Sequence, residues 1–221
     1  GYAALDANTT ASNNVAVGRL SLSTVEIGDD NTAVGTNALI VNTASDNTAV
    51  GSLALDANEG GTRNTAVGKS ALSTVVTGAD NTAVGTNALL LNTASDNTAV
   101  GSLALDANST GTQNTAVGGV ALSANTTGSY NTAVGQSSLD ANESGASNTA
   151  VGRLSLSAVV SGDNNVAVGT NALAASTASD NTAVGAFALD VNTSGANNVA
   201  VGKASLGANE SGGDNTAVGM N

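Results

Sequence analysis

The sequence contains no cysteine, no histidine and no proline, and its only aromatic residues are Tyr2, Tyr130 and Phe187. Disulfides, thiolate nucleophiles, imidazole bases and Cys/His metal sites are therefore all excluded. Because Ala and Val supply most of the apolar residues, the chain lacks the large side chains that fill a deep globular core. The absence of proline suits a backbone whose amides all enter β-ladders.

Basic residues and long apolar runs are also scarce. Lysine and arginine total 5 against 17 acidic residues, which gives a formal net charge of −12. Phosphate binding requires a basic stripe, so we expect no nucleic-acid partner. The longest apolar runs, such as 38–41 and 88–91, are far shorter than the roughly 20 residues of a membrane helix. We expect no membrane insertion of this segment and no cofactor.

The sequence consists instead of one repeat, marked by the pentad Asn-(Thr/Val)-Ala-Val-Gly. Successive pentads start 17 residues apart in nine intervals and 16 apart in three, and each Gly precedes two variable residues, Ala or Ser, and then Leu. The missing residue of a short unit falls in the polar tract before the next pentad, as expected for a loop. The thirteen pentads start at Asn14, Asn31, Asn47, Asn64, Asn81, Asn97, Asn114, Asn131, Asn148, Asn165, Asn181, Asn198 and Asn215.

This period predicts an all-β, parallel β-solenoid with one repeat of about 17 residues per coil. At about 3.3 Å per residue, one unit is long enough for two short strands and two turns. We expect residues 1–221 to be a single continuous array of 12–13 coils. Because the array begins and ends in mid-unit without a polar capping repeat, we also expect it to be a segment of a longer protein.

The pentad predicts which side chains face the core. Positions two and four share one face of a strand, and the exchange of Thr for Val at position two indicates that this face is buried. The unvarying Ala at position three indicates a second closely packed face, which contacts either a turn of the same chain or a neighbouring subunit. We expect the Asn to form a ladder between coils and the Gly to adopt a backbone conformation closed to other residues. Two of the repeats serve as examples of these structural positions: Asn31, Ala33, Val34, Gly35 and Leu39 in one, and Asn81, Ala83, Val84, Gly85 and Leu89 in the other.

The pattern Asn-Thr-Ala-Val-Gly-x-x-Ala-Leu resembles the head repeats of trimeric autotransporter adhesins. Residues 15–18, Val-Ala-Val-Gly, are similar to the Val-Ala-Ile-Gly of that motif. The repeats also resemble those of tail-fibre-like proteins of phages and bacteria. The resemblance implies a left-handed β-roll in a homotrimer around one axis, with pentad position three on the inter-chain side. It also implies an extracellular location, at a cell surface or on a virion.

Three further sets of residues are candidate sites. Aspartates recur directly after the repeat Leu and directly before the pentad Asn, where stacked carboxylates could bind Ca²⁺, although turn formation is the favoured explanation. Four basic residues follow the pentad Gly, which predicts a solvent-exposed position: Arg19, Lys69, Arg153 and Lys203. Asn-x-Ser/Thr sequons, which could carry glycan or arise by coincidence, occur at Asn8, Asn108, Asn125, Asn142, Asn192 and Asn209.

These patterns favour a non-enzymatic shaft or head of an extracellular fibre or adhesin that gives reach and multivalent attachment. Its expected partners are other copies of itself and a host or environmental surface ligand. A catalytic site needs unlike groups that converge, whereas this chain presents the same groups in every repeat. The alternatives are a phage tail fibre and an ice-binding solenoid. Threonine ladders favour ice binding, but the predicted burial of the Thr/Val face argues against it.

Overall fold

The computed structural model describes residues 1–24 and 27–221 of the chain. They form two compact units, Gly1–Thr112 and Gln113–Asn221, and both consist of parallel strands joined by turns. The described ranges contain no helix, and so no helix that could cross a bilayer. The predicted all-β parallel solenoid, with one coil per repeat, is confirmed.

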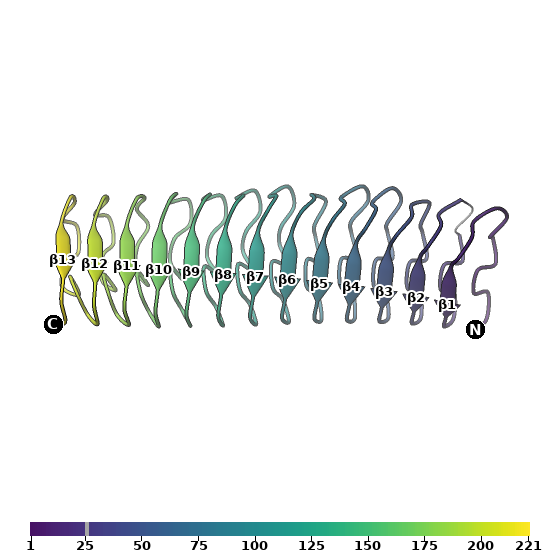
Figure 1. Ribbon diagram of the computed structural model, residues 1–221, viewed down its shortest axis with the longest axis horizontal. Coiled ribbons are helices and arrows are strands. Elements are labelled where there is room, and N and C mark those ends of the chain that lie inside the picture. The colour runs from purple at the N-terminus through teal and green to yellow at the C-terminus, as the bar shows by residue number, and fades with distance from the viewer. Residues whose placement is uncertain (25–26) are drawn as a thin grey trace. The chain divides into compact units, whose positions relative to one another are not determined.

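Each pentad contributes one strand of three residues, from position two to position four. The first unit contains β1 (Val15–Val17), β2 (Thr32–Val34), β3 (Thr48–Val50), β4 (Thr65–Val67), β5 (Thr82–Val84) and β6 (Thr98–Val100). The second contains β7 (Thr115–Val117), β8 (Thr132–Val134), β9 (Thr149–Val151), β10 (Val166–Val168), β11 (Thr182–Val184), β12 (Val199–Val201) and β13 (Thr216–Val218). Within each unit, strands of successive coils lie side by side and in parallel, as Figure 1 shows.

Within each unit, pairing is in register from coil to coil, including the short repeats. Ala33 lies opposite Ala49, 16 residues away, and Ala150 lies opposite Ala167, 17 residues away. The backbone N–H of Thr32 donates to the Asn47 carbonyl at 2.8 Å. The variation in repeat length is therefore absorbed in the loops, as predicted, and each coil presents the same residue types at the same height.

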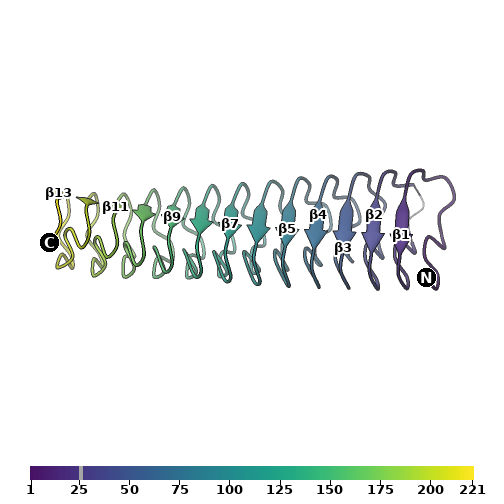
Figure 2. The same ribbon diagram turned by 60° about the horizontal axis from the view of Figure 1, so that its bottom comes forward.

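The prediction of two strands per coil is wrong, because only the pentad forms a strand. After the Gly, the second residue and the repeat Leu both take left-handed backbone angles, with φ of 57° at Asn87 and 51° at Leu89. These residues turn the chain and still bond to the adjacent coils. Asn87 N–H donates to the Lys69 carbonyl at 3.0 Å and Leu89 N–H to the Ala104 carbonyl at 3.1 Å. The backbone polar groups are thus paired without a second ladder. Figure 2 shows the turns on either side of the strands.

The repeat Leu fills the interior of the coil from this unusual conformation. Leu39 and Leu89 are fully buried, with φ of 47° and 51°. A left-handed non-glycine residue costs roughly 1–2 kcal/mol, and burial of a leucine side chain contributes about 1.5–3 kcal/mol. Burial therefore offsets the strain, which explains why an apolar residue occupies this position.

The pentad Gly is required for two reasons. Gly35 and Gly85 have φ of 142° and 140°, which side-chain-bearing residues rarely adopt. In addition, a Cβ atom at Gly85 would lie 2.5 Å from the carbonyl oxygen of Gly101 in the next coil. The glycines thus let the coils stack at the end of each strand.

Candidate interaction face

The largest regular surface of each unit is the Thr/Val face, which we define as pentad positions two and four of the strands. Our prediction that this face is buried is wrong. Val84 is 37% exposed, Val34 is half-exposed, and the pentad threonines of the inner coils are half-exposed. Exchange of Thr for Val is equally compatible with a half-exposed sheet surface, because β-branched side chains suit a pleated surface in general.

The pentad Ala faces inward instead. Ala33 and Ala83 are fully buried within a single chain, alongside the buried Leu39 and Leu89 of the same coils. Of the two alternatives for this position, packing against the same chain is therefore correct. The inter-chain role implied by the resemblance is wrong, because nothing outside the coil can reach these methyl groups. The interior beside a leucine leaves room for only a small side chain.

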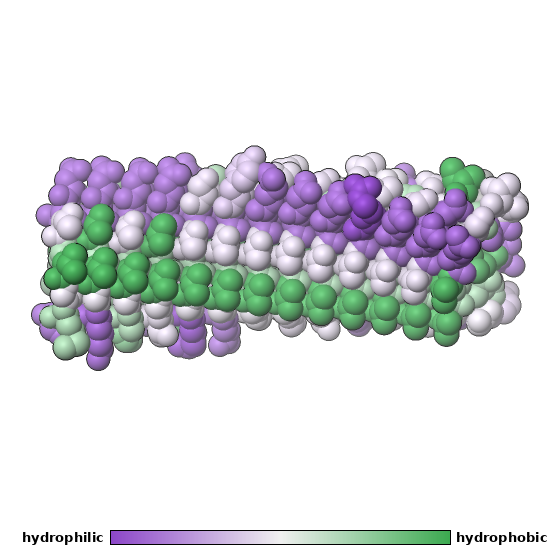
Figure 3. All heavy atoms as spheres, in the orientation of Figure 1, coloured by the Kyte–Doolittle hydropathy of each residue, from purple (hydrophilic) through white to green (hydrophobic). Residues whose placement is uncertain are grey.

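Valines form an apolar band along the Thr/Val face of each unit. Figure 3 shows this band in green, with a paler band beside it and hydrophilic side chains beyond. Ten of the thirteen pentad valines are at least 36% exposed: Val17, Val50, Val67, Val84, Val100, Val117, Val168, Val184, Val201 and Val218. A contiguous exposed apolar band of this kind is a candidate surface for contact with a partner.

The threonine hydroxyls of this face differ from those of the loops. Loop threonines donate across the coils, as Thr74 does to the Leu90 carbonyl at 2.6 Å and Thr177 to the Thr193 carbonyl at 2.8 Å. By contrast, within the described ranges no hydrogen bond is found for the hydroxyl of a pentad threonine such as Thr82. Because pairing is in register, these hydroxyls form a regular row that is accessible to a ligand or to water.

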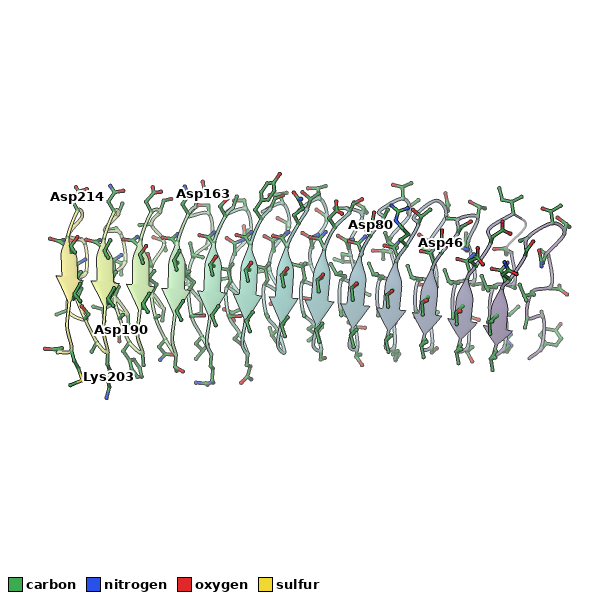
Figure 4. All side chains as sticks on the ribbon, in the orientation of Figure 1. Asp46, Asp80, Asp163, Asp190, Lys203 and Asp214 are labelled. Carbon is green, nitrogen blue, oxygen red and sulfur yellow. The ribbon has the colours of Figure 1, made fainter. Side chains whose placement is uncertain are left out.

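Charged residues border the Thr/Val face on its two sides. We call the residues directly before the pentad Asn the acidic edge, and those directly after the pentad Gly the basic edge. Figure 4 shows Asp46, Asp80 and Asp214 at the beginning of the strands and Lys203 at the opposite end. The charged members of the acidic edge are Asp30, Asp46, Arg63, Asp80, Asp96, Asp180 and Asp214. Those of the basic edge are Arg19, Lys69, Arg153 and Lys203, all of them exposed as predicted.

Arg63 is the one cation on the acidic edge, and Asp80 neutralises it. Nε and Nη2 of Arg63 each donate to one carboxylate oxygen of Asp80 in the next coil, both at 2.7 Å. The hydrogen bonds and charge of Arg63 lower the pKa of Asp80, and those of Asp80 raise the pKa of Arg63. Both side chains are exposed, so this pair contributes little to stability.

The pentad asparagines lie beneath one border of the face and connect the coils. Asn31 is fully buried, and its Oδ1 accepts from the backbone N–H of Asn47 at 3.0 Å while its Nδ2 donates to the Ala44 carbonyl at 2.9 Å. Asn81 donates in the same way, to the Ala94 carbonyl at 2.8 Å. The predicted ladder exists, but it runs mainly from side chain to backbone. These asparagines are structural and are not accessible to a ligand.

A second asparagine column, eleven residues after most of the pentad asparagines, was not predicted from the sequence. Asn142 Nδ2 donates to Asn125 Oδ1 of the preceding coil at 2.8 Å, and Asn58 Nδ2 donates to Asn42 Oδ1 at 2.8 Å. Recurrence of Asn at this repeat position is visible in the sequence and could have revealed the column. Most of the sequons belong to it, and four of them are buried: Asn108, Asn125, Asn142 and Asn192. Glycan on these side chains is incompatible with the folded coil.

The aspartates after the repeat Leu do not form a continuous acidic column. Asp56, for example, has Ile40 and Ser73 at the same repeat position in the adjacent coils. Burial raises the pKa of Asp56, Asp106 and Asp140, against the opposing effect of backbone hydrogen bonds. Over the part of the chain that the structure describes, no three acidic side chains gather closely enough to hold a metal ion.

Comparison of the chain with known proteins identifies no relative. No family model matches the chain, and no curated protein or solved structure matches it either.

Proposed function

We propose that the chain is a non-enzymatic shaft or head segment of an extracellular fibre or adhesin, which self-associates through the Thr/Val face. The observation that carries this proposal is the in-register row of exposed valines, since an apolar surface of this regularity is stabilised by a partner that covers it. The partner is another copy of the chain. The assembly is the homotrimer of left-handed β-rolls that the resemblance implies, with the Thr/Val face on the inter-chain side in place of the alanines.

The bonding between coils supports a mechanical role. Backbone hydrogen bonds, buried leucines and asparagines connect each coil to its neighbours, and the same pattern recurs in every repeat. Stability in such a molecule is a sum over neighbouring repeats, so length can be gained by adding coils. Identical surfaces on successive coils let weak contacts to a host or environmental surface ligand add up. Display at a cell surface fits this role, and display on a virion as a phage tail fibre is the rival within the same class.

Light scattering on the purified chain tests the proposal. We expect a mass about three times the 21.0 kDa of one chain, because the assembly that the resemblance implies is a homotrimer. Lysine at Val67, Val84 and Val100 should reduce the mass to that of a monomer, since three charges would be buried in the apolar band. A mass of one chain for the unaltered protein would refute self-association.

The matched control places lysine at exposed apolar residues outside the face. Val41 and Leu91 follow the repeat Leu by two residues and are 38% and 50% exposed, comparable to the valines of the face at 37%. Val41→Lys together with Leu91→Lys should leave the mass unchanged. If this control dissociates the assembly as completely as the face variant does, a different surface holds the copies together.

Ice binding is a second candidate, because the structure removes the objection to it. The Thr/Val face points outward, and its threonine hydroxyls form a regular row without hydrogen-bond partners in the described ranges. A flat array of evenly spaced hydroxyl and methyl groups is suited to ordering water. A thermal-hysteresis assay tests this candidate: a monomer that is active at micromolar concentration, and inactive after Thr82→Lys, would favour ice binding over self-association.

A further inference from the structure

We propose that a second copy docks on the Thr/Val face with its coil axis parallel to that of the first, so that the acidic edge of one copy meets the basic edge of the other. This inference rests on the proposed self-association and adds its polarity. It is carried by the sorting of charge to the two borders of the face.

The sorting is present in each unit taken alone. In Gly1–Thr112 the acidic edge carries four aspartates and Arg63, a net charge of −3, and the basic edge carries Arg19 and Lys69, a net charge of +2. In Gln113–Asn221 the acidic edge carries Asp180 and Asp214, a net charge of −2, and the basic edge carries Arg153 and Lys203, a net charge of +2. No acidic residue occurs on the basic edge of either unit.

Two polarities are possible when two such faces meet. Rotation of the partner about an axis parallel to the coil axis reverses its strand direction and places its basic edge beside the acidic edge of the first copy. Rotation about an axis parallel to the strands keeps the strand direction and places acidic edge beside acidic edge. Only the first arrangement joins opposite charges, and it holds equally for two copies or for three around one axis. Complementary charge has more influence on which of the two arrangements forms than on how tightly the copies bind.

The spacing of the charges agrees with the parallel arrangement. The four cations on the basic edge occur in coils without an aspartate on the acidic edge, and for Arg19, Lys69 and Lys203 an adjacent coil carries one, whereas the coils beside that of Arg153 carry Tyr130 and Asn164. Lys69 belongs to the coil between those of Asp46 and Asp80, and Lys203 to the coil between those of Asp180 and Asp214. Adjacent coils are about 4.8 Å apart, a distance that the long side chain of lysine spans. A lysine of one copy can therefore reach a carboxylate of the other: Asp46 for Lys69, since Arg63 already binds Asp80, and Asp180 or Asp214 for Lys203.

Two other charged groups must be considered at this border. Arg63 lies in the same coil as Lys69, but Asp80 of its own chain already binds it at 2.7 Å. The aspartates after the repeat Leu come four residues beyond the basic edge, and Asp56, Asp106, Asp140 and Asp190 are partly buried. Arg63 is exposed on the acidic edge, but its ion pair with Asp80 offsets its charge.

The test uses a change that has opposite effects in the two arrangements. Asn should replace Asp30, Asp46 and Asp96 in the full chain. Asn occupies the same position in other repeats, at Asn13, Asn164 and Asn197, where φ is 57–58°, against 56–63° at the three aspartates, so the fold is retained. The control replaces Glu59, Glu143 and Glu210 with Gln, which changes the net charge equally at exposed loop positions. Dissociation constants are compared by sedimentation at low salt.

In the parallel arrangement, the edge variant loses attraction and should associate about 3- to 10-fold more weakly than the control. In the antiparallel arrangement, it loses repulsion and should associate more tightly than the control. Association as tight as that of the control, or tighter, would overturn the parallel polarity while leaving self-association intact. If the unaltered chain stays monomeric at every concentration, the proposed function and this polarity both fall.

Discussion

The two asparagine columns have the same side chain and similar burial but differ in continuity. Every repeat has Asn at the first pentad position, and each Oδ1 in the inner coils accepts from the backbone of the next coil, as Asn148 does from Asn165 N–H at 2.9 Å. The second column is interrupted at Val25, Val75, Val159 and Ser176. The oxygens Asn58 Oδ1 and Asn142 Oδ1, one coil before Val75 and Val159, are buried without a hydrogen-bond partner. In the pentad column a missing Asn leaves a backbone N–H of the next coil without its acceptor, whereas in the second column a gap leaves only a side-chain oxygen without a partner.

This difference predicts that the pentad column contributes more to stability. Asn148→Ala removes the acceptor of the Asn165 N–H and the donor that lies 2.7 Å from the Gly162 carbonyl. Two buried backbone groups then lack partners, and each costs about 1–3 kcal/mol. We expect a loss of about 2–5 kcal/mol in the free energy of unfolding, measured by urea denaturation of the full chain. Thr170→Ala, at an exposed position after Gly169, should change it by less than about 0.5 kcal/mol.

Asn142→Ala should be milder. Its Nδ2 donates to Asn125 Oδ1 at 2.8 Å and to the Gly145 carbonyl at 3.0 Å, but its Oδ1 has no partner to lose. A loss of about 1–2 kcal/mol is expected in the same denaturation experiment. Equal losses for Asn142→Ala and Asn148→Ala would show that the contrast between the two columns has no energetic meaning.

Filling a gap in the second column should couple to the residue before it. In Val159→Asn, the new amide would lie one coil beyond Asn142 Oδ1 and could donate to it. Loss of the buried valine opposes this gain, so the informative quantity is the coupling in a double-mutant cycle with Asn142→Ala. We expect Val159→Asn to be about 1 kcal/mol more favourable when Asn142 is present. A coupling near zero would mean that the unpaired oxygen is satisfied by water.

The sequence was sufficient to predict the coil period, the role of Gly85 and the bonding of Asn31 and Asn81 between coils, because in each case the same residue recurs at the same repeat position. It was not sufficient to predict which strand face is inside. Alanine at position three and β-branched residues at positions two and four are each compatible with either face, and the choice depends on where Leu89 places its side chain. That placement follows from a left-handed φ at the leucine, which leaves no sequence signal because leucine disfavours it.

The smallest expected effect concerns Asp140, which follows a repeat Leu and whose pKa is shifted in the opposite direction to that of Asp80 on the acidic edge. Burial raises the pKa of Asp140 above its ordinary value of 3.8, so the folded state binds its proton more tightly than the unfolded state does. The group therefore destabilises the fold at neutral pH, and this cost disappears as the pH falls through the raised pKa. Arg63 lowers the pKa of Asp80, so the stabilisation from Asp80 is present above 3.8 and is lost below it.

Asp140→Asn should consequently stabilise the chain slightly at pH 7, and its advantage should shrink as the pH falls toward 4. Thermal unfolding of both proteins across this range measures the difference, with Asp180→Asn at the exposed acidic edge as the control for net charge. An advantage of Asp140→Asn that is the same at every pH would reflect the lower net charge of the variant and not the burial of this carboxylate. An advantage confined to the upper part of the range would show that burial of the Asp140 carboxylate is the cause, because desolvation penalises only its charged form.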